Sequence, residues 1–343
     1  MWSAPAERSA DGALDSIEVL KLAYPKRSRA TLASALQNEF FSSLLGLDSL
    51  ARAECVASVE QSLGIELKPE EVSTAQTVGE LVRLANAKIS GGPRPVESAP
   101  AEFHWRDVLA ETPEELPEVE QLLRRKPGME FFAQVVLRFI HLSAWLLFRM
   151  EVKGREVLDQ LEPPYLICPN HQSYIDPLLV CSVYPRSVLR NVFHVGASMY
   201  FANAAMAQLA RLINVVPIDP DVQLLRAMRA GAAGLRAGKI LNIYPEGQRS
   251  FDGQLQEFKK GAAILATELN IPIVPVALDG AYRIWPRKSW RFRLAKVKIS
   301  FGTPVDARKI ASDEADEEVV YERVTAVLKQ RIQQMLDEMR REE

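Results

Sequence analysis

Short apolar runs alternate with helical patterns through the second part of the chain. Helical spacing occurs near residues 198–211, 221–237 and 258–269, between the apolar runs. This alternation predicts a sheet flanked by helices, which is an α/β fold with a mixed sheet. The expected strands are YLICP (165–169), NVFHV (191–195), NVVPI (214–218), KILNIYP (239–245), IPIVPVAL (271–278) and KVKISFG (296–302).

Two further stretches predict long helices. Residues 315–340 place Val320, Val324, Val327, Ile332, Met335 and Met339 on one stripe with a 3.6-residue period, as in an amphipathic helix. Residues 129–150, MEFFAQVVLRFIHLSAWLLFRM, are apolar around most of the helical wheel. Their polar positions Glu130, Gln134, Arg138, His141 and Arg149 fall within about 100°. Such a helix lies in a core or in a lipid interface, and we expect the interface.

The first part of the chain predicts a separate, all-helical unit. Helical patterns cover 16–24, 49–64 and 77–89, with Gly64 ending the second. Residues 89–102 are rich in Gly, Pro, Ser and Ala and predict a flexible linker. We therefore expect one domain at 1–88 and a second at 103–343.

Bulk composition excludes several classes of protein. The 343 residues are 48% apolar and carry a formal net charge of −2, which gives no signal for nucleic-acid binding. The three cysteines and four histidines lack the spacing of a metal site or a disulfide framework. Neither a signal peptide nor a run of 18 uncharged apolar residues is present, so we expect a cytoplasmic protein without a transmembrane helix.

The first candidate for chemistry is Asn170-His171-Gln172-Ser173-Tyr174-Ile175-Asp176, directly after a predicted strand. Strand ends are common sites of chemistry in α/β folds. A carboxylate at Asp176 can turn back to the imidazole of His171, fix its tautomer and leave the other nitrogen as a base. The alternative is a structural role, with Asp176 capping the next helix before Pro177.

The second candidate is Tyr244-Pro245-Glu246-Gly247-Gln248-Arg249-Ser250, also after a predicted strand, continued by Phe258-Lys259-Lys260-Gly261. A Glu-Gly turn with an Arg and two Lys suits a ligand that carries phosphate. The alternative is a turn with solvated charges.

Together these motifs resemble the glycerolipid acyltransferase family, which contains the 1-acylglycerol-3-phosphate acyltransferases, over about residues 128–305. His171 and Asp176 match its HxxxxD element, and Pro245, Glu246 and Gly247 match its Pro-Glu-Gly element. The resemblance implies that His171 deprotonates an acceptor hydroxyl, which attacks an acyl thioester in one step. It also implies substrate binding by Glu246, Gly247, Arg249, Ser250 and Lys259.

One position departs from that family. Its members usually carry an Arg just after the strand between the two motifs, where it is held to bind the acceptor phosphate. Here Pro220 stands at that place, and Arg226 and Arg229 follow on the next predicted helix. Acylation of a non-phosphorylated lipid or secondary metabolite therefore stays open as an alternative.

A carrier motif opens the strongest helix of the first unit, Gly46-Leu47-Asp48-Ser49-Leu50. A serine at a helix start is otherwise an ordinary N-cap. With SVEQSLGIELKPEEVSTAQTVGELVRLA behind it, the segment resembles the acyl carrier protein family over about residues 11–88. The resemblance implies a four-helix bundle with phosphopantetheine on Ser49, attached by a phosphopantetheinyl transferase.

Residues 282–298 hold seven Lys or Arg, no acid and two Trp. Basic residues interleaved with Trp suit anionic lipid headgroups, and a solvated loop or a nucleic-acid site is the alternative.

These readings combine into one hypothesis, a peripheral membrane O-acyltransferase fused to its own carrier. The donor is acyl-CoA or an acyl carrier loaded by a synthetase in trans, and the acceptor is a lysophospholipid such as lysophosphatidic acid. Tethering the carrier raises the donor's effective concentration. The rival from another class is a non-catalytic lipid-binding scaffold that uses the carrier for docking.

Overall fold

The computed structural model describes residues 104–110, 127–196, 213–218, 223–287, 291–311 and 316–342, with residues 56, 60, 65, 67, 83–85, 87, 88, 208 and 289. It divides the chain into two compact units, Met1–Asp107 with Asp221–Leu225 and Val108–Pro220 with Arg226–Glu343. Ser49, the linker and most of the expected N-terminal helices lie outside the described residues. Within the first unit, Val56, Leu67 and Ala85 are buried, and Leu67 donates its N–H to Glu60 at 2.7 Å.

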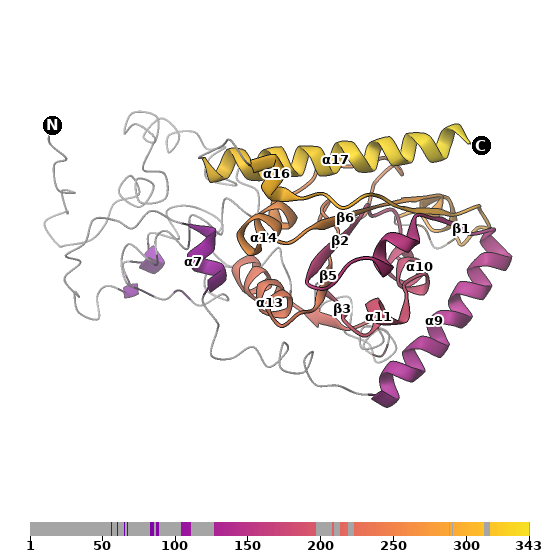
Figure 1. Cartoon of the computed structure of the whole chain (residues 1–343), viewed down its shortest axis with the longest axis horizontal. Helices are drawn as coiled ribbons and strands as arrows, with labels where there is room; N and C mark the ends of the chain where they lie inside the picture. Colours follow the sequence, from indigo (N-terminus) through magenta and orange to yellow (C-terminus); the bar gives the residue numbers. More distant parts are fainter. Residues whose placement is uncertain are drawn as a thin grey trace, which may run out of the picture. The chain divides into compact units, whose positions relative to one another are not determined.

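The described part of the second unit is built on a mixed seven-stranded sheet in the order β1-β7-β6-β2-β5-β3-β4 (Figure 1). All neighbouring strands are parallel except β6 and β7, so β1 and β7 run opposite to the other five. The strands are β1 (Glu151–Lys153), β2 (Tyr165–Pro169), β3 (Val192–Gly196), β4 (Val215–Pro217), β5 (Ile240–Asn242), β6 (Ile273–Asp279) and β7 (Lys298–Phe301). The six strands expected from the sequence are confirmed, and β1 is additional.

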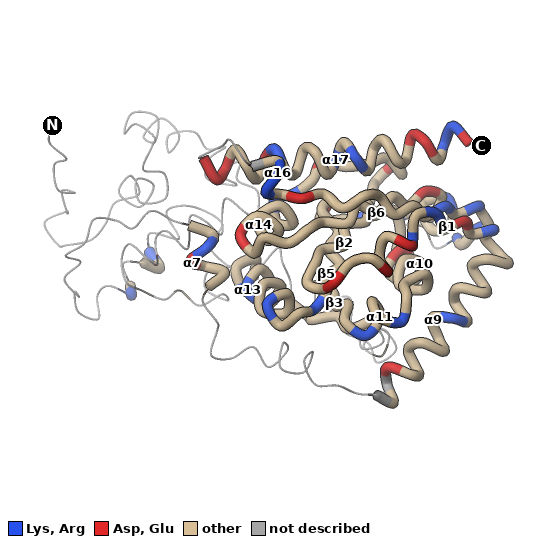
Figure 2. Tube along the Cα trace, in the orientation of Figure 1, with Lys and Arg blue, Asp and Glu red and all other residues tan. Residues whose placement is uncertain are grey.

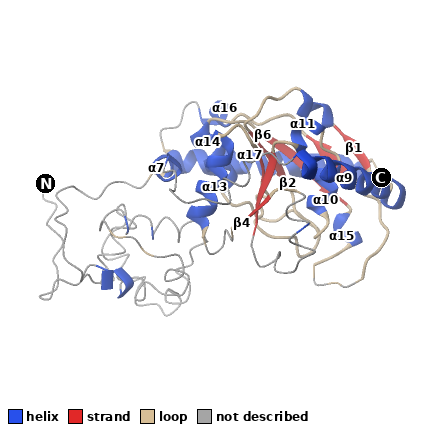
Figure 3. Cartoon of the chain, turned by 90° about the horizontal axis from the view of Figure 1, so that it is seen from below, coloured by secondary structure: helices blue, strands red, loops and turns tan. Residues whose placement is uncertain are grey.

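Helices flank this sheet, as the strands and helices of Figure 3 show from a second direction. They are α9 (Pro127–Phe148), α10 (Asp176–Ser182), α11 (Arg186–Leu189), α13 (Leu224–Arg236), α14 (Gly261–Leu269), α15 (Ala281–Ile284), α16 (Ala307–Ala311) and α17 (Glu317–Arg341), with a 3-10 turn at Arg155–Asp159. A further helix, α7 (Trp105–Ala110), is divided in sequence between the two units. The long helices predicted at 129–150 and 315–340 are thus confirmed as α9 and α17. The α/β fold class is confirmed as well.

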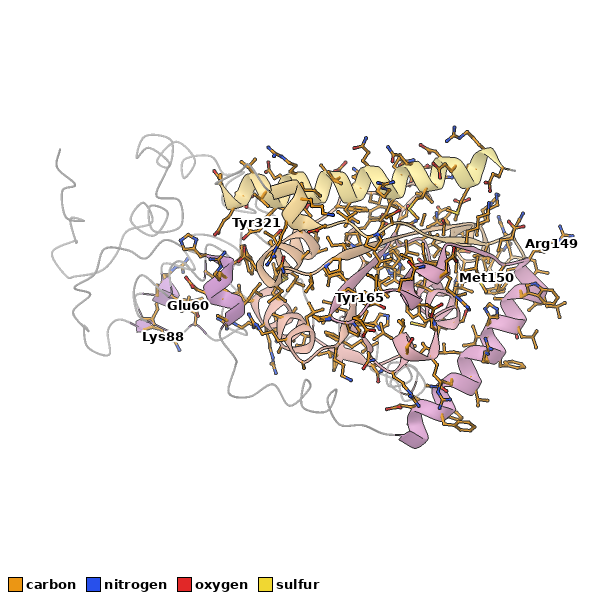
Figure 4. All side chains as sticks on the ribbon, in the orientation of Figure 1. Glu60, Lys88, Arg149, Met150, Tyr165 and Tyr321 are labelled. Atoms are coloured by element: carbon orange, nitrogen blue, oxygen red, sulfur yellow. The ribbon has the colours of Figure 1, made fainter. Side chains whose placement is uncertain are left out.

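The central strands are buried on both faces, which explains their uninterrupted apolar runs. Val274, Val276 and Leu278 of β6 belong to the core cluster that includes residues of α9 and α10. Successive side chains of a strand point to opposite faces, so Ile273, Pro275 and Ala277 face the other side. Helix α17 packs along β6 on that side, and α14 contacts both α17 and β2. Tyr165 at the start of β2 is fully buried (Figure 4).

Close packing explains a glycine inside helix α13. A Cβ at Gly234 would stand 2.4 Å from the ring of Phe193 on β3. Glycine costs helix stability, roughly 1 kcal/mol against alanine. Here it lets the helix backbone approach the ring closely, so α13 can cover its side of the sheet.

Helix α9 buries a narrow stripe and exposes a wide apolar one. Leu137, Ala144 and Phe148 are buried, at helical spacing. The exposed apolar residues are Phe131, Phe132, Val135, Phe139, Leu142, Trp145, Leu146 and Leu147. Charged positions are few along this helix in Figure 2. By length and composition, Glu130–Phe148 is the one described helix that could cross a membrane. The sequence alone did not predict this, because charged residues interrupt the run of apolar residues.

Candidate active site

Loops after three adjacent parallel strands meet at one edge of the sheet. The strands are β2, β5 and β6, and they are followed by residues 170–175 (the first loop), 243–250 (the second loop) and 280–287 (the third segment). Carboxyl ends of neighbouring parallel strands lie together, and open α/β sheets commonly place their sites there. Asn170 ties the first loop to β6, because its side chain donates to the Leu278 carbonyl at 3.0 Å and accepts the Leu278 N–H at 2.7 Å.

The imidazole of His171 is hydrogen-bonded to Asp176. Nδ1 lies 2.8 Å from Oδ2 of the carboxylate, which is fully buried at the start of α10. The same oxygen accepts the backbone N–H groups of Gln172 at 2.5 Å and Ser173 at 2.7 Å. With a carboxylate as its partner, Nδ1 carries the proton in the neutral ring. Nε2 is then the basic nitrogen, and the His171 side chain is 17% exposed.

The second loop holds the backbone of His171 from both sides. Oε1 of Glu246 accepts the His171 N–H at 2.6 Å, and the Ser250 N–H donates to the His171 carbonyl at 2.8 Å. The ring of Tyr244 stacks on the imidazole with centroids 4.2 Å apart. Three residues of one loop therefore fix the position of a histidine about 75 positions earlier in the chain.

Glu246 is buried and has chain partners for both oxygens. Oε2 accepts the Gln256 N–H at 2.9 Å, while Oε1 holds His171. Burial raises the pKa of this carboxyl to about 7, against the opposing effect of the two N–H donors. The charge on Asp176 acts in the same direction as burial and contributes to this raised pKa. Ser250 is equally enclosed, and its hydroxyl donates to the Gln254 carbonyl at 2.7 Å within the turn.

The backbone conformation of the turn at Gly247 favours glycine. Its φ is +69°, a conformation that L side chains rarely adopt. A Cβ there would also lie 2.7 Å from Cε and 3.1 Å from Nζ of Lys259. The Lys259 side chain therefore lies directly over the exposed glycine. The backbone N–H of Lys259 donates to the Pro245 carbonyl at 2.8 Å.

Arg249 lies on the face of Tyr174 from the first loop. Its guanidinium carbon is 3.3 Å from the ring centroid, which is a cation–π contact. Tyr174 is 45% exposed and also contacts Trp285 at 5.3 Å between rings. The two predicted motifs are thus joined by side chains as well as by their backbones.

The third segment, which follows β6, also contributes to the site. The sequence alone did not place it there. Nη1 of Arg287 donates to the Arg249 carbonyl at 3.2 Å and to Oε1 of Gln248 at 3.3 Å. Tyr282 donates its hydroxyl to the Phe251 carbonyl at 2.8 Å, and Ser173 donates to the Trp285 carbonyl at 2.9 Å. The basic and aromatic pattern of 282–298 was the available signal, but it suggested lipid headgroups instead.

The other candidate residues lie outside this cluster or outside the residues that the structure describes. Nε of Arg229 donates to the Val108 carbonyl at 3.2 Å, which is a structural use of that side chain. Pro220 and Ser49 lie outside the described residues. Cys168 and Cys181 are buried free thiols, and burial raises the pKa of both. The described residues contain no group of His, Cys, Asp and Glu that could hold a metal ion.

Comparison with known proteins assigns two parts of the chain. Residues 149–279 match the family model described as Acyltransferase, and residues 29–85 match the one described as Phosphopantetheine attachment site. A solved structure, a 1-acyl-sn-glycerophosphate acyltransferase from Thermotoga maritima, aligns with a TM-score of 0.49 and 22% identity over 64% of this chain and 86% of that one.

Several curated proteins are similar in sequence. A chloroplastic 1-acyl-sn-glycerol-3-phosphate acyltransferase of Brassica napus is 29% identical over 43% of this chain and 42% of its own length. Its Arabidopsis thaliana counterpart is 30% identical over 43% and 41%, and the human alpha enzyme is 24% identical over 52% and 62%. The chain spans about half the length of the curated relatives it matches. It contains an acyltransferase-family domain at residues 149–279, and a phosphopantetheine attachment site domain at residues 29–85.

Proposed function

We propose that the chain transfers an acyl group from a thioester to the hydroxyl of a lysophospholipid of the 1-acylglycerol-3-phosphate type. The observation that carries this proposal is the bond between Nδ1 of His171 and the buried carboxylate of Asp176. The printed names of the relatives support the acceptor class. Cations at Arg249 and Lys259, next to the histidine loop, support a phosphate on that acceptor.

The reaction follows from the arrangement around His171. Nε2 accepts the proton of the acceptor hydroxyl as the oxygen attacks the thioester carbonyl. The carbon–sulfur bond breaks, and the imidazolium returns its proton to the departing thiolate. Asp176 stabilises the imidazolium between these two transfers. The products are an ester and a free thiol, and no covalent bond to the enzyme is required.

The remaining site residues divide between positioning and binding. Glu246 and Ser250 position His171 through its backbone, because their polar atoms are already engaged by the chain. Gly247, Arg249 and Lys259 form the side that faces the acceptor phosphate. A scaffold without activity has no need for a carboxylate aimed at a histidine nitrogen. The alternative, a non-phosphorylated acceptor, is tested by comparing two substrates. It is excluded if the enzyme acylates monoacylglycerol far more slowly than 1-acylglycerol-3-phosphate.

The N-terminal domain supplies the donor in this proposal. A phosphopantetheinyl transferase attaches the arm to Ser49, and a synthetase acting in trans loads it with an acyl chain. The match of residues 29–85 to the attachment site family supports this role. Acyl-CoA carries the same thioester and is the alternative donor.

Helix α9 supplies the membrane contact. Eight large apolar side chains on one helix are exposed, which is far more than a water-facing helix normally carries. The exposed Phe292, Leu294 and Arg291 add apolar and basic groups near its end, where Phe292 contacts Phe148 at 5.7 Å. A lipid acceptor is then taken directly from the bilayer surface.

The first test replaces the proposed base. His171→Ala should lower kcat with a lysophosphatidate acceptor by about 10²–10⁴-fold, because a positioned base is lost. Asp176→Asn should also lower it, because the amide no longer favours the imidazolium. Steady-state assays with acyl-CoA measure both effects, and unchanged thermal unfolding serves as the control. Near-normal turnover in His171→Ala contradicts the catalytic role.

The second test concerns the buried carboxyl of Glu246. Its pKa is raised from 4.5 to about 7, so the native state binds more protons than the unfolded state between these values. Its favourable contribution is therefore complete below pH 4.5 and is lost as pH rises to about 7. Wild type should lose roughly 3 kcal/mol at most, relative to Glu246→Gln, across that window. Urea unfolding at pH 5 and pH 7.5 measures it, and a pH-independent difference contradicts the expectation.

The third test concerns the carrier arm. Incubation with coenzyme A and a phosphopantetheinyl transferase should add the mass of one arm to the wild-type chain. Ser49→Ala should abolish the addition, whereas Ser16→Ala, at the other Leu-Asp-Ser sequence, should leave it intact. Intact-mass spectrometry reads out all three proteins. Modification of Ser49→Ala would show that another residue carries the arm.

The fourth test concerns the exposed stripe of α9. The triple variant Phe139→Gln, Leu142→Gln, Leu146→Gln should lose binding to anionic vesicles at both low and high salt, because burial of apolar groups is not screened. Arg291→Gln should lose binding mainly at low salt, by about 1 kcal/mol for the one charge removed. Val319→Gln on α17 is the control. Vesicle co-sedimentation that does not change in the triple variant contradicts the proposal.

A further inference from the structure

We propose that Arg287 binds the acceptor phosphate together with Arg249 and thereby determines specificity for phosphorylated acceptors. This inference rests on the acceptor class proposed above. It assigns a residue of the basic segment 282–298 to the acceptor site, where the sequence alone suggested a lipid-headgroup contact.

A single peptide unit connects Arg287 to the catalytic loop. The carbonyl between Arg249 and Ser250 accepts from Nη1 of Arg287 at 3.2 Å. The N–H of the same unit donates to the His171 carbonyl at 2.8 Å. In a planar trans peptide these two groups point in opposite directions, so the guanidinium and the histidine backbone lie on either side of one peptide unit. Nη1 of Arg287 therefore lies roughly 8 Å from the carbonyl oxygen of His171, a separation that a glycerol hydroxyl at the histidine and a phosphate on the next carbon can span.

The guanidinium is also held in orientation by an aromatic ring. Its central carbon lies 4.3 Å above the ring of Phe251, which is 54% exposed, and Nη1 donates to Oε1 of Gln248. Arg249 is stacked in the same way on Tyr174. Stacking fixes the plane of a guanidinium while its N–H groups point outward in that plane, the geometry used for bidentate phosphate recognition. Two stacked arginines thus meet at the turn of residues 247–251, because Arg249 belongs to the turn and Arg287 stacks on its Phe251.

The local charge balance favours an anion. Lys259 lies over Gly247 and adds a third cation to the turn. Asp252 is an exposed acid next to this turn, and its Oδ1 accepts the Ser250 hydroxyl at 3.1 Å and the Gln254 N–H at 2.9 Å. Glu257 is also exposed, and it pairs with Lys329 at 2.6 Å. Asp176 and Glu246 are buried behind the loop. A phosphate group at this turn would meet three positive side chains.

The position of Arg287 separates it from its neighbours on the same segment. Arg293 is exposed, and its backbone N–H donates to the Ile284 carbonyl. Both arginines add one positive charge to the segment, and Arg287 donates to the 247–250 turn. Arg293 therefore offers a matched control for a general charge effect.

The test uses the full-length chain in neutral detergent micelles, which remove anionic lipid. Arg287→Gln should raise KM for 1-acylglycerol-3-phosphate about tenfold, the size of one lost charged hydrogen bond, with kcat changed less than about twofold. Arg287→Lys should fall between the variant and wild type, because the charge stays and the fork is lost. Arg293→Gln should match wild type. Thermal unfolding of each variant checks that the fold is intact.

A binding measurement runs beside the kinetics with sn-glycerol 3-phosphate as the probe. Wild type and Arg293→Gln should bind it by calorimetry, and Arg287→Gln should bind it about tenfold more weakly. Equal KM and equal probe binding in Arg287→Gln and Arg293→Gln would overturn the inference. If wild type binds the probe through Arg287 but does not acylate lysophosphatidate, the proposed activity is refuted and the phosphate site stands. Absence of probe binding by wild type overturns the site itself.

Discussion

The arrangement of this site depends on how the backbone of His171 is held. Its N–H and its carbonyl are both bonded to the loop that follows β5, through Glu246 and Ser250. A side chain can reach the same geometry from a loose loop only by losing conformational entropy during each turnover. Here that cost is met during folding, when β2 and β5 pair in parallel and bring their carboxyl ends together.

Strand order then decides which loops can take part. Because β2 lies between β5 and β6, its loop has neighbours on both sides. Asn170 bonds both polar groups of Leu278 on one side, while Glu246 and Ser250 act from the other. The segment after β6 can therefore reach across to the loop after β5, and Arg287 closes the connection at the Arg249 carbonyl. A ligand over this edge would contact residues from three places in the chain.

The sequence predicted the local features well and the long-range ones poorly. Apolar runs predicted β2, β5 and β6, and the two motifs predicted His171 with Asp176 and the turn at Gly247. Strand β1, three residues with mainly exposed side chains, carries no apolar run and was missed. The contacts of Arg287 were missed for a different reason. Its partners are a backbone carbonyl, a side-chain amide and an aromatic ring some 36 to 39 positions away, and no local pattern encodes such contacts.

Two buried carboxyl groups beside one histidine have different tasks because their surroundings differ. Asp176 receives two backbone N–H groups and the imidazole on one oxygen, so it can support a positive ring. Glu246 is desolvated and lies near that charge, and its pKa rises to about 7. Two adjacent buried charges of like sign would repel, and a proton on Glu246 relieves that repulsion. A neutral carboxyl still offers its carbonyl oxygen to the His171 N–H, so the positioning bond survives protonation. Environment separates an electrostatic partner from a positioning group, as it separates acid and base roles in many active sites.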